Sequence, residues 1–379
     1  MTKNKDQIVF VNQSSGYLMI DIIRAFEGLY DESILLAGTV NPLNIDLPEK
    51  VKIHYLAKYN RNSKFQKAIS WIISFIQIIW IIKTKYKNAF LFIVTNPPLT
   101  IFIPFFCKNK YSLLFYDIYP DALTNLGFLN KSSLFVRIWQ NANKIILKKA
   151  SRIVTISEGM RKLLEQYSCD RTVDVIPIWT HNNFFKTNPR HQNIFLAEHA
   201  LSGKFIVLYS GNLGYSHDVD VIIDLAEILQ NKDIFFLIIG RGEKYDSISL
   251  EISRRSLNNC MILPLQPSNI LPYSFSAADV AIVTLSKNAS NLSLPSKTYN
   301  YLSAGAPLLC IAASDSELGN LVSSYNIGRC FSKNQINEMT EYILKLKNNS
   351  QYYSLLKTNA YSTSLLFDVD NALSFLPNV

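Results

Sequence analysis

Cysteine and histidine are scarce in this sequence, and neither has the spacing of a metal site or a disulfide framework. Five cysteines stand at positions 107, 169, 260, 310 and 330, and none forms a Cys-x-x-Cys pair. An odd number cannot all pair within one chain, so we expect reduced thiols and a cytosolic protein. The five histidines also lack ligand spacing, so we expect neither a metal nor an organic cofactor.

The sequence also predicts neither a secretory signal nor a membrane-spanning helix. Residues 1–5 run directly into an apolar strand pattern, so we predict no signal peptide. The longest apolar run, 68–82, would make a helix of about 22 Å, which is shorter than the roughly 30 Å hydrocarbon core of a bilayer. We therefore expect that this run does not span a membrane.

Length and patterning predict an α/β protein with two domains. A chain of 379 residues exceeds the usual limit of one hydrophobic core, and β-branched runs alternate with helical patterns throughout. Parallel strands are expected near residues 7–12, 33–37, 51–55, 89–95, 111–116, 152–156, 172–176, 204–210, 233–240, 260–264, 279–284 and 307–312. We place a Rossmann-like domain at 1–180, a polar linker at 181–203, a second Rossmann-like domain at 204–348 and a tail at 349–379.

A lysine and a helix start stand together at residues 294–307, whose sequence is LPSKTYNYLSAGAP. Proline suits the first turn of a helix, where free N–H groups carry about half a positive charge, and Lys297 adds a full charge. Gly305 ends the helix, and 308–312 are predicted to form a buried parallel strand. This unit predicts an anion site, and the alternative is an ordinary surface helix that Lys297 caps.

A second anion-binding turn is predicted about eighty residues earlier, where a β-branched strand runs into Gly211-Asn212-Leu213-Gly214. The backbone of such a glycine turn can approach a pyrophosphate closely. A further strand ends in Gly240-Arg241-Gly242. Two such turns in one α/β domain, with Arg241 between them in the sequence, favour a nucleoside diphosphate as the ligand.

Five further segments resemble, in their order and spacing, motifs of glycosyltransferase family 4, in its bacterial surface-polysaccharide branch. They are Asn96-Pro97-Pro98, Asp117-Ile118-Tyr119-Pro120-Asp121, Ser157-Glu158-Gly159-Met160, Val175-Ile176-Pro177 and Ala277-Ala278-Asp279-Val280. The resemblance covers most of the chain. It implies the GT-B fold, in which two Rossmann-like domains face each other across a cleft, and it implies that the tail at 349–379 packs back on the first domain.

The same resemblance implies a retaining, metal-independent transferase. The donor would be a nucleoside-diphosphate sugar, with UDP as the expected nucleotide, and the transferred group a hexosyl or N-acetylhexosaminyl residue. The acceptor would be a polyprenyl-diphosphate-linked saccharide at the inner face of the cell membrane. Such a reaction belongs to capsule, lipopolysaccharide O-antigen or exopolysaccharide synthesis.

Three residues are the catalytic candidates. Lys297 and Arg241 would stabilise the leaving diphosphate. Asp117, expected at the carboxyl end of a strand, would hold the acceptor hydroxyl or the donor sugar, and its alternative role is a helix cap. The residues expected to bind the donor are Gly211, Asn212, Gly214, Leu265, Gln266, Ser296, Tyr299, Asn300 and Glu317.

The sequence departs from the family at two of these positions. The family carries one glutamate where this chain has Leu292 and another where it has Asn300, and the second glutamate meets the ribose of the donor. An amide can bond a ribose hydroxyl, but without the strength that a carboxylate charge adds. Whether Asn300 takes over that role stays open at this point.

Charge is shared unevenly along the chain. Residues 1–190 hold 25 Lys and Arg against 13 Asp and Glu, a balance of +12, and the remainder holds 13 against 16, a balance of −3. Basic residues flank the apolar run at 68–82, so we expect a helix that beds into the inner leaflet or faces the acceptor. The residues expected on that side are Lys64, Lys67, Trp71 and Trp80, and the alternative is a core helix under the first sheet.

Other functions were weighed against transfer. Nucleic acid is not expected as a partner, because the lysines flank an apolar helix and no binding signature is visible. Asp218-Val219-Asp220 and Asp368-Val369-Asp370 match an Asp-x-Asp metal pattern, but we expect structural roles for both. A sugar-nucleotide epimerase of the same fold and a non-catalytic nucleotide-sugar-binding subunit are the two remaining alternatives.

Overall fold

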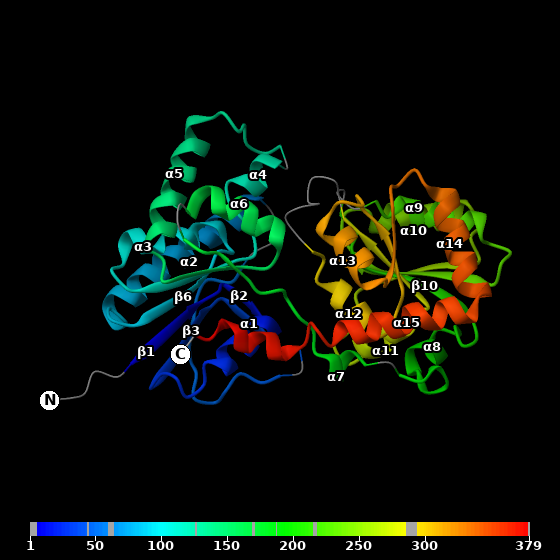
Figure 1. Cartoon of the computed structure of the whole chain (residues 1–379), viewed down its shortest axis with the longest axis horizontal. Helices are drawn as coiled ribbons and strands as arrows, with labels where there is room; N and C mark the ends of the chain where they lie inside the picture. Colours follow the sequence, from blue (N-terminus) through cyan, green and yellow to red (C-terminus); the bar gives the residue numbers. More distant parts are fainter. Residues whose placement is uncertain are drawn as a thin grey trace. The chain divides into compact units, whose positions relative to one another are not determined.

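The computed structural model describes residues 6–43, 45–59, 64–125, 127–168, 171–186, 188–214, 218–285 and 294–377. The chain divides into two units, Met1–Ile178 with Asp370–Val379, and Trp179–Val369. Each unit is built on one parallel sheet with helices on its faces (Figure 1). The predicted α/β fold class is confirmed, and the predicted strands coincide with observed ones to within about two residues at each end.

The first unit contains a seven-stranded parallel sheet. Its strand order is β5 (Lys52–Tyr55), β3 (Glu32–Ala37), β1 (Gln7–Val11), β6 (Phe90–Val94), β7 (Tyr111–Phe115), β8 (Arg152–Thr155) and β9 (Asp174–Val175). A small parallel pair, β2 (Ser14–Gly16) and β4 (Thr39–Asn41), was not predicted, because three-residue strands carry too little periodicity to be seen in a sequence.

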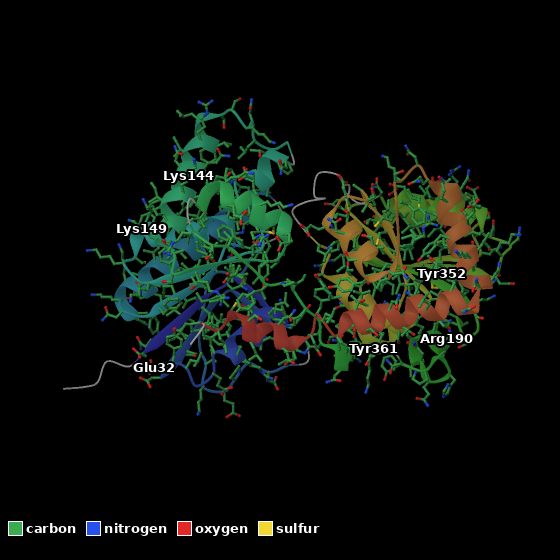
Figure 2. The ribbon with its side chains drawn as sticks, viewed as in Figure 1. Glu32, Lys144, Lys149, Arg190, Tyr352 and Tyr361 are labelled. Carbon is green, nitrogen blue, oxygen red and sulfur yellow. The ribbon has the colours of Figure 1, made fainter. Side chains whose placement is uncertain are left out.

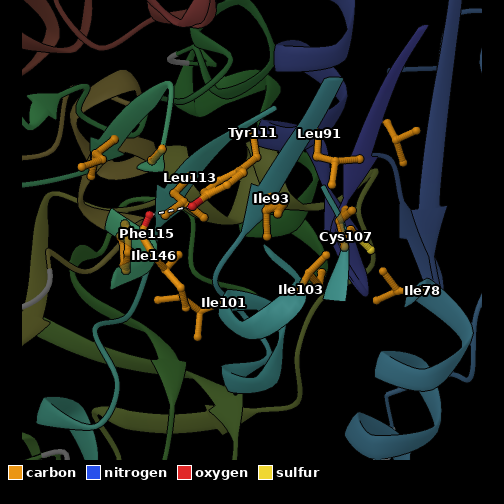
Figure 3. Close-up of a cluster of buried hydrophobic side chains, with 14 of the residues drawn as sticks. Ile78, Leu91, Ile93, Ile101, Ile103, Cys107, Tyr111, Leu113, Phe115 and Ile146 are labelled. Carbon is orange, nitrogen blue, oxygen red and sulfur yellow. Dashed lines mark hydrogen bonds between the residues drawn. The ribbon is translucent and has the colours of Figure 1, made fainter. Parts of the chain in front are cut away.

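Helices cover both faces of this sheet. The helical segments are α1 (Tyr17–Ala25), α2 (Lys64–Lys85), η1 (Pro98–Phe102), α3 (Ile103–Phe106), α4 (Asp121–Asn125), α5 (Leu134–Lys149), α6 (Glu158–Ser168) and η4 (Val369–Phe375). In Figure 1, α1 and η4 lie on one side of the sheet, and α2, α5 and α6 lie on the other. Figure 3 shows the core on the α2 side, where Ile78 and Ile146 lie beside strand residues and the Tyr111 hydroxyl donates to the Ile146 carbonyl over 2.6 Å.

The second unit contains a six-stranded parallel sheet. Its strand order is β12 (Cys260–Leu263), β11 (Ile234–Arg241), β10 (Phe205–Asn212), β13 (Val280–Thr284), β14 (Leu308–Ile311) and β15 (Gly328–Phe331). Its helical segments are α7 (Asn182–Phe185), η2 (Arg190–Gln192), α8 (Ile194–Glu198), α9 (Asp220–Ile228), α10 (Tyr245–Arg254), α11 (Leu271–Ser276), α12 (Lys297–Ser303), α13 (Glu317–Tyr325), α14 (Ile336–Asn348) and α15 (Ser350–Ser364). Strand β15 was not among the predicted strands.

The segment predicted as a linker, 181–203, is folded into the second unit. Phe185 and Phe195 are buried in it, and Arg190, labelled in Figure 2, donates to the Asp279 carboxylate over 2.9 Å. The same carboxylate accepts from the backbone N–H of Ile206 over 2.8 Å and from the Tyr353 hydroxyl over 3.0 Å. The segment is mostly polar, so its composition did not indicate these few buried residues. The boundary between the units lies after Ile178.

The predicted tail, 349–379, is divided between the two units. Helix α15 belongs to the second unit, whereas residues from Asp370 onward belong to the first. There the Arg152 guanidinium donates to the carbonyls of Leu376 over 3.0 Å and Ser374 over 2.9 Å, and the Phe375 ring lies 5.9 Å from that of Phe92. Burial of Phe375 against the α1 side of the first sheet explains why the end of the chain is attached to it.

The strand orders locate the edges where a ligand can bind. In each sheet the chain winds outward first in one direction and then in the other, and the order reverses between β1 and β6 and between β10 and β13. Ligands of open α/β sheets bind outside the carboxyl ends of the strands at such a reversal. The chemistry of the two units is therefore expected at these two edges.

Candidate functional site

A cavity of about 170 Å³ lies at the reversal point of the second sheet. It is formed by the carboxyl ends of β10 and β13 together with the start of α12. The lining residues are Tyr209, Ser210, Gly211, Asn212, Ile282, Val283, Thr284, Pro295, Ser296, Lys297 and Tyr301. The structure thus brings together the two segments that the sequence marked as anion-binding, around positions 211 and 297.

Glycines beside the cavity are required by close backbone approaches. A Cβ atom at Gly240 would lie 2.3 Å from the carbonyl oxygen of Gly211, and one at Gly242 would lie 2.6 Å from the backbone of Leu213. Gly242 also has a φ of +146°, which other residues rarely adopt. The end of β11 therefore supports the turn at 211–214 from below, and the Leu213 N–H donates to the Arg241 carbonyl over 2.8 Å.

Two cations meet at this site. Burial, and in second place the positive charge of Arg241, lower the pKa of Lys297 from its ordinary value to about 8. Arg241 itself is exposed at the end of β11. Both causes of this lower pKa disfavour the charged amine. An anionic ligand would offset the loss of hydration and the repulsion by Arg241.

The short helix α12 turns its residues to different sides. Tyr301, one turn after Lys297, lines the cavity and accepts a hydrogen bond from the Ser210 N–H over 2.6 Å. Tyr299 is only 2% exposed and packs 4.9 Å from the Phe367 ring, so the structure differs from its predicted place beside the ribose. The reason is helical rotation, since positions 297 and 299 face about 200° apart.

Asn300 has a partner within the second unit. Its side-chain oxygen accepts from the Thr180 hydroxyl over 2.7 Å, and Thr180 is fully buried just after the boundary between the units. The oxygen keeps a second lone pair, but it is uncharged, so it offers a ribose hydroxyl a weaker acceptor than a glutamate does. Leu292, the other position where the family carries glutamate, lies outside the described residues.

The donor candidates Leu265, Gln266 and Glu317 do not line the cavity. Leu265 is 40% exposed after β12, and the Gln266 amide donates to the Pro264 carbonyl over 2.8 Å. Glu317 opens α13 after β14, behind Ser316, whose hydroxyl caps the helix by accepting from the Gly319 N–H over 3.0 Å. Tyr209, Thr284 and Tyr301 line the cavity but were missed, and the only signal for Tyr301 was its spacing of four residues from Lys297.

Asp117 follows β7 at the carboxyl edge of the first sheet, as predicted. The Asn96 amide donates to its carboxylate over 3.3 Å, and the Thr95 hydroxyl donates to its backbone carbonyl over 3.1 Å. Burial raises the pKa of Asp117 above the usual value, and the charge of Lys67 opposes that rise. The side chain is therefore a partly desolvated carboxylate facing a cation.

The two tryptophans of α2 lie in different environments. Trp80 is 61% exposed on the outer face, as a membrane-facing residue would be. Trp71 is half-buried beside Tyr59 and Lys67, so it does not share the surroundings of Trp80. The side chain of Lys64 lies outside the described residues.

One aspartate of each Asp-x-Asp pattern has a structural partner. Asp220 pairs with Lys244, and the Asp368 carboxylate accepts from the Val369 N–H. Within the described ranges, no three His, Cys, Asp or Glu side chains gather in a way that could hold a metal ion.

Comparison with known proteins agrees with this geometry. The model of the family "Glycosyl transferases group 1" matches residues 192–363, which lie within the second unit. WbjE of Pseudomonas aeruginosa, named as a probable glycosyltransferase, is 26% identical over 336 residues, which cover 85% of this chain and 83% of WbjE. WcaI of Escherichia coli K12, whose name assigns it to colanic acid biosynthesis, is 26% identical over 215 residues, 55% of this chain and 53% of WcaI.

Solved structures show the same fold. HepE of Anabaena, crystallised with UDP-glucose, has a TM-score of 0.70 at 14% identity over 97% of both chains. The lipopolysaccharide glycosyltransferase WaaG has a TM-score of 0.68 at 11% identity, again over 97% of both. Two parallel α/β sheets, a cationic cavity at the reversal point of the second and these matches lead to one conclusion. Residues 192–363 of the chain resemble the group 1 glycosyltransferases, and the whole chain has the GT-B fold.

Proposed function

We propose that this glycosyltransferase moves a sugar from a UDP-sugar to a lipid-linked saccharide, with retention of configuration, in bacterial surface-polysaccharide synthesis. The observation that carries the donor assignment is the cavity that Lys297 lines together with Gly211 and Asn212, where the charge of Arg241 also acts on Lys297. Such a cavity offers two positive charges and exposed strand ends to a diphosphate. UDP-glucose bound to the structurally similar HepE supports UDP as the nucleotide.

Transfer of the sugar requires that the leaving diphosphate is stabilised. As the bond between the anomeric carbon and the diphosphate breaks, negative charge grows on the departing phosphate oxygen. Lys297, at the wall of the cavity, and Arg241, at the end of β11, can stabilise that charge. The names of WcaI and WaaG place similar proteins in colanic acid and lipopolysaccharide synthesis, which supports a saccharide acceptor of the same kind.

Mass spectrometry with a panel of nucleotide sugars tests this function. We expect the purified chain, mixed with a polyprenyl-diphosphate-linked saccharide, to release nucleoside diphosphate and to add one sugar to the acceptor. Conversion of UDP-N-acetylglucosamine into an isomer without any acceptor would contradict transfer and establish the epimerase. Tight UDP binding without transfer across a broad acceptor panel would establish the non-catalytic subunit.

UDP binding should depend on pH through Lys297. The protonated amine binds the diphosphate, and the bound anion raises the lysine pKa above its unliganded value of about 8. Between these two values the Kd should rise with pH, approaching about tenfold per unit, because binding must then take up a proton. Calorimetry between about pH 7 and pH 9.5 measures this. In Lys297→Arg, which stays charged, the rise should disappear, and an equal rise in both proteins would contradict the assignment.

The outer side of the first unit is proposed to dock on an anionic membrane. Here "apolar surface" denotes the exposed residues of three helices, α2, α3 and α5. They are Phe65, Ile69, Ile72, Ile73, Ile76, Trp80, Phe105, Phe106, Leu134, Phe135, Ile138 and Ile145, each between 39% and 75% exposed. Aromatic contacts join the helices beneath it, from Phe75 to Phe106 at 5.7 Å and from Phe102 to Trp139 at 5.4 Å.

Charge around the apolar surface favours a bilayer with anionic lipids. Residues 50–157 contain only two acidic side chains, Asp117 and Asp121, and neither lies on α2, α3 or α5. Exposed lysines follow these helices, including Lys83 and Lys85 on α2 and, in Figure 2, Lys144 and Lys149 on α5. Each basic residue near an anionic surface adds about 1 kcal/mol to binding, so the patch should attach reversibly.

Helix α2 is longer than the sequence predicted, and this affects how it can meet a membrane. Its 22 residues extend for about 33 Å, and Phe65–Lys85 is the one stretch of the described residues long and apolar enough to cross a bilayer. However, Ser74 and Ile78 on its inner face are buried against the first unit, and Gln13 donates to the Ser74 hydroxyl over 2.6 Å. We therefore propose that α2 lies on the membrane with its outer face.

A further inference from the structure

The first turns of α2 direct two side chains away from the apolar surface. Lys67 and Trp71 are one helical turn apart, and the same stripe continues through Ser74 and Ile78, which are fully buried. Lys67 and Trp71 therefore belong to the inner face of α2, next to the carboxyl edge of the first sheet. Membrane lipid does not account for their position.

An aromatic pair holds the ammonium group of Lys67. The rings of Tyr59 and Trp71 are nearly parallel, at 8°, with centroids 6.2 Å apart. The Lys67 nitrogen lies 5.1 Å from the Trp71 centroid and 5.7 Å from that of Tyr59. Ring faces attract a cation but are not conventional hydrogen-bond acceptors, so the N–H donors of Lys67 remain suited to an anionic ligand.

The charge of Lys67 acts on a carboxylate at the carboxyl edge of the first sheet. Asp117 is oriented by the Asn96 amide at 3.3 Å, and the charge of Lys67 acts on it. Burial raises the pKa of Tyr119, and the negative charges of Asp117 and ionised Tyr59 would raise it further. The cluster thus combines one cation, one carboxylate and flat aromatic faces at the edge where the first sheet is expected to bind its ligand.

We propose that Tyr59, Lys67, Trp71 and Asp117 form the subsite for the glycosyl-phosphate end of the acceptor, with Lys67 on the phosphate and Asp117 on a sugar hydroxyl. The proposal rests on the proposed function, because it takes the acceptor to be lipid-linked. A free phosphate meets repulsion from Asp117, and a neutral sugar leaves Lys67 without an anion. A glycosyl phosphate satisfies both groups, and the apolar surface on the same helix is available to the lipid.

Binding of glucose 1-phosphate, inorganic phosphate and glucose to the full chain tests the subsite. Saturating UDP first occupies the donor cavity, and ligand-detected nuclear magnetic resonance then measures each affinity. We expect the parent to prefer glucose 1-phosphate over phosphate and over glucose. Lys67→Gln should weaken both phosphate-bearing probes about tenfold, as expected for a lost charged hydrogen bond. Asp117→Asn should weaken glucose 1-phosphate but strengthen inorganic phosphate, which a purely structural role would not do.

Lys83→Gln is the matched control, since Lys83 is an exposed lysine in the last turn of the same helix. It should bind all three probes as the parent does. Equal affinity of Lys67→Gln and the parent for glucose 1-phosphate would overturn the subsite, and so would an undetectable interaction with the parent. Calorimetry with UDP alone distinguishes failure of the subsite from failure of the proposed function. Lys67→Gln should bind UDP as the parent does. If the parent binds no UDP, only the donor assignment is refuted.

Discussion

Replacing Lys297 by alanine is expected to lower the turnover number for sugar transfer by about 100- to 1000-fold, the usual effect of removing one group that stabilises a transition-state charge. Lys297 lines the cavity at the reversal point and lies near Arg241, so its loss leaves one cation to stabilise the departing phosphate. The measurement is initial-rate transfer at saturating donor, with release of nucleoside diphosphate as the readout.

Folding should not explain the loss. Burial and Arg241 lower the pKa of Lys297, so the charged amine is unfavourable in the unliganded fold, and removing it should not reduce the melting temperature. Lys232→Ala, at an exposed turn before β11, is the control and should keep full activity. The usual loss for such a group is about 100- to 1000-fold, so activity of Lys297→Ala within about threefold of the parent would contradict the diphosphate assignment.

Replacing Ile72 and Ile76 together by aspartate should weaken membrane binding by at least about 100-fold. Both side chains are exposed on α2, at 50% and 61%, so they can enter the lipid without leaving a protein core. Each forfeits about 1.5–3 kcal/mol of apolar burial, and the two new charges add repulsion from anionic lipid. Sedimentation with phosphatidylethanolamine and phosphatidylglycerol vesicles measures the partition coefficient.

A double variant of the second unit is the matched control. Ile194 and Leu250 are exposed to a similar extent, at 51% and 67%, on helices α8 and α10. Their replacement by aspartate should leave vesicle binding unchanged, and added salt should weaken binding by the parent. Equal partition of the Ile72/Ile76 variant and the parent would show that the apolar surface does not dock on lipid.

The segments that line the cavity around Gly211 and Lys297 could be predicted from the sequence because their signals are local. A glycine turn after a β-branched strand and a lysine at a helix start are both visible in a short window, and parallel topology brings strand ends to one edge. The sequence could not show which side of α12 meets the cavity. Tyr299 and Tyr301 differ by two positions, yet one packs on Phe367 and the other bonds the backbone of β10.

The linker predicted at 181–203 differs from the structure for another reason. Residues 181–203 are mostly polar, and composition alone favoured a linker. Their burial depends on a few anchors, among them Phe185 and Phe195, and on the ion pair of Arg190 with Asp279. Those two residues are 89 positions apart, so no local pattern announces the contact.

By itself, the sequence determined the fold class and most of the strands, and it predicted residues for a diphosphate, because each depends on periodicity or on a short motif. Helix α2 is apolar nearly all round, so its sequence does not indicate which face packs against the sheet. Only the tertiary structure decided that Ser74 and Ile78 face the sheet, that Ile72 and Ile76 face outward and that the charge of Lys67 acts on Asp117. The physical reason is that packing against the sheet, and not the helix's own periodicity, sets its rotation.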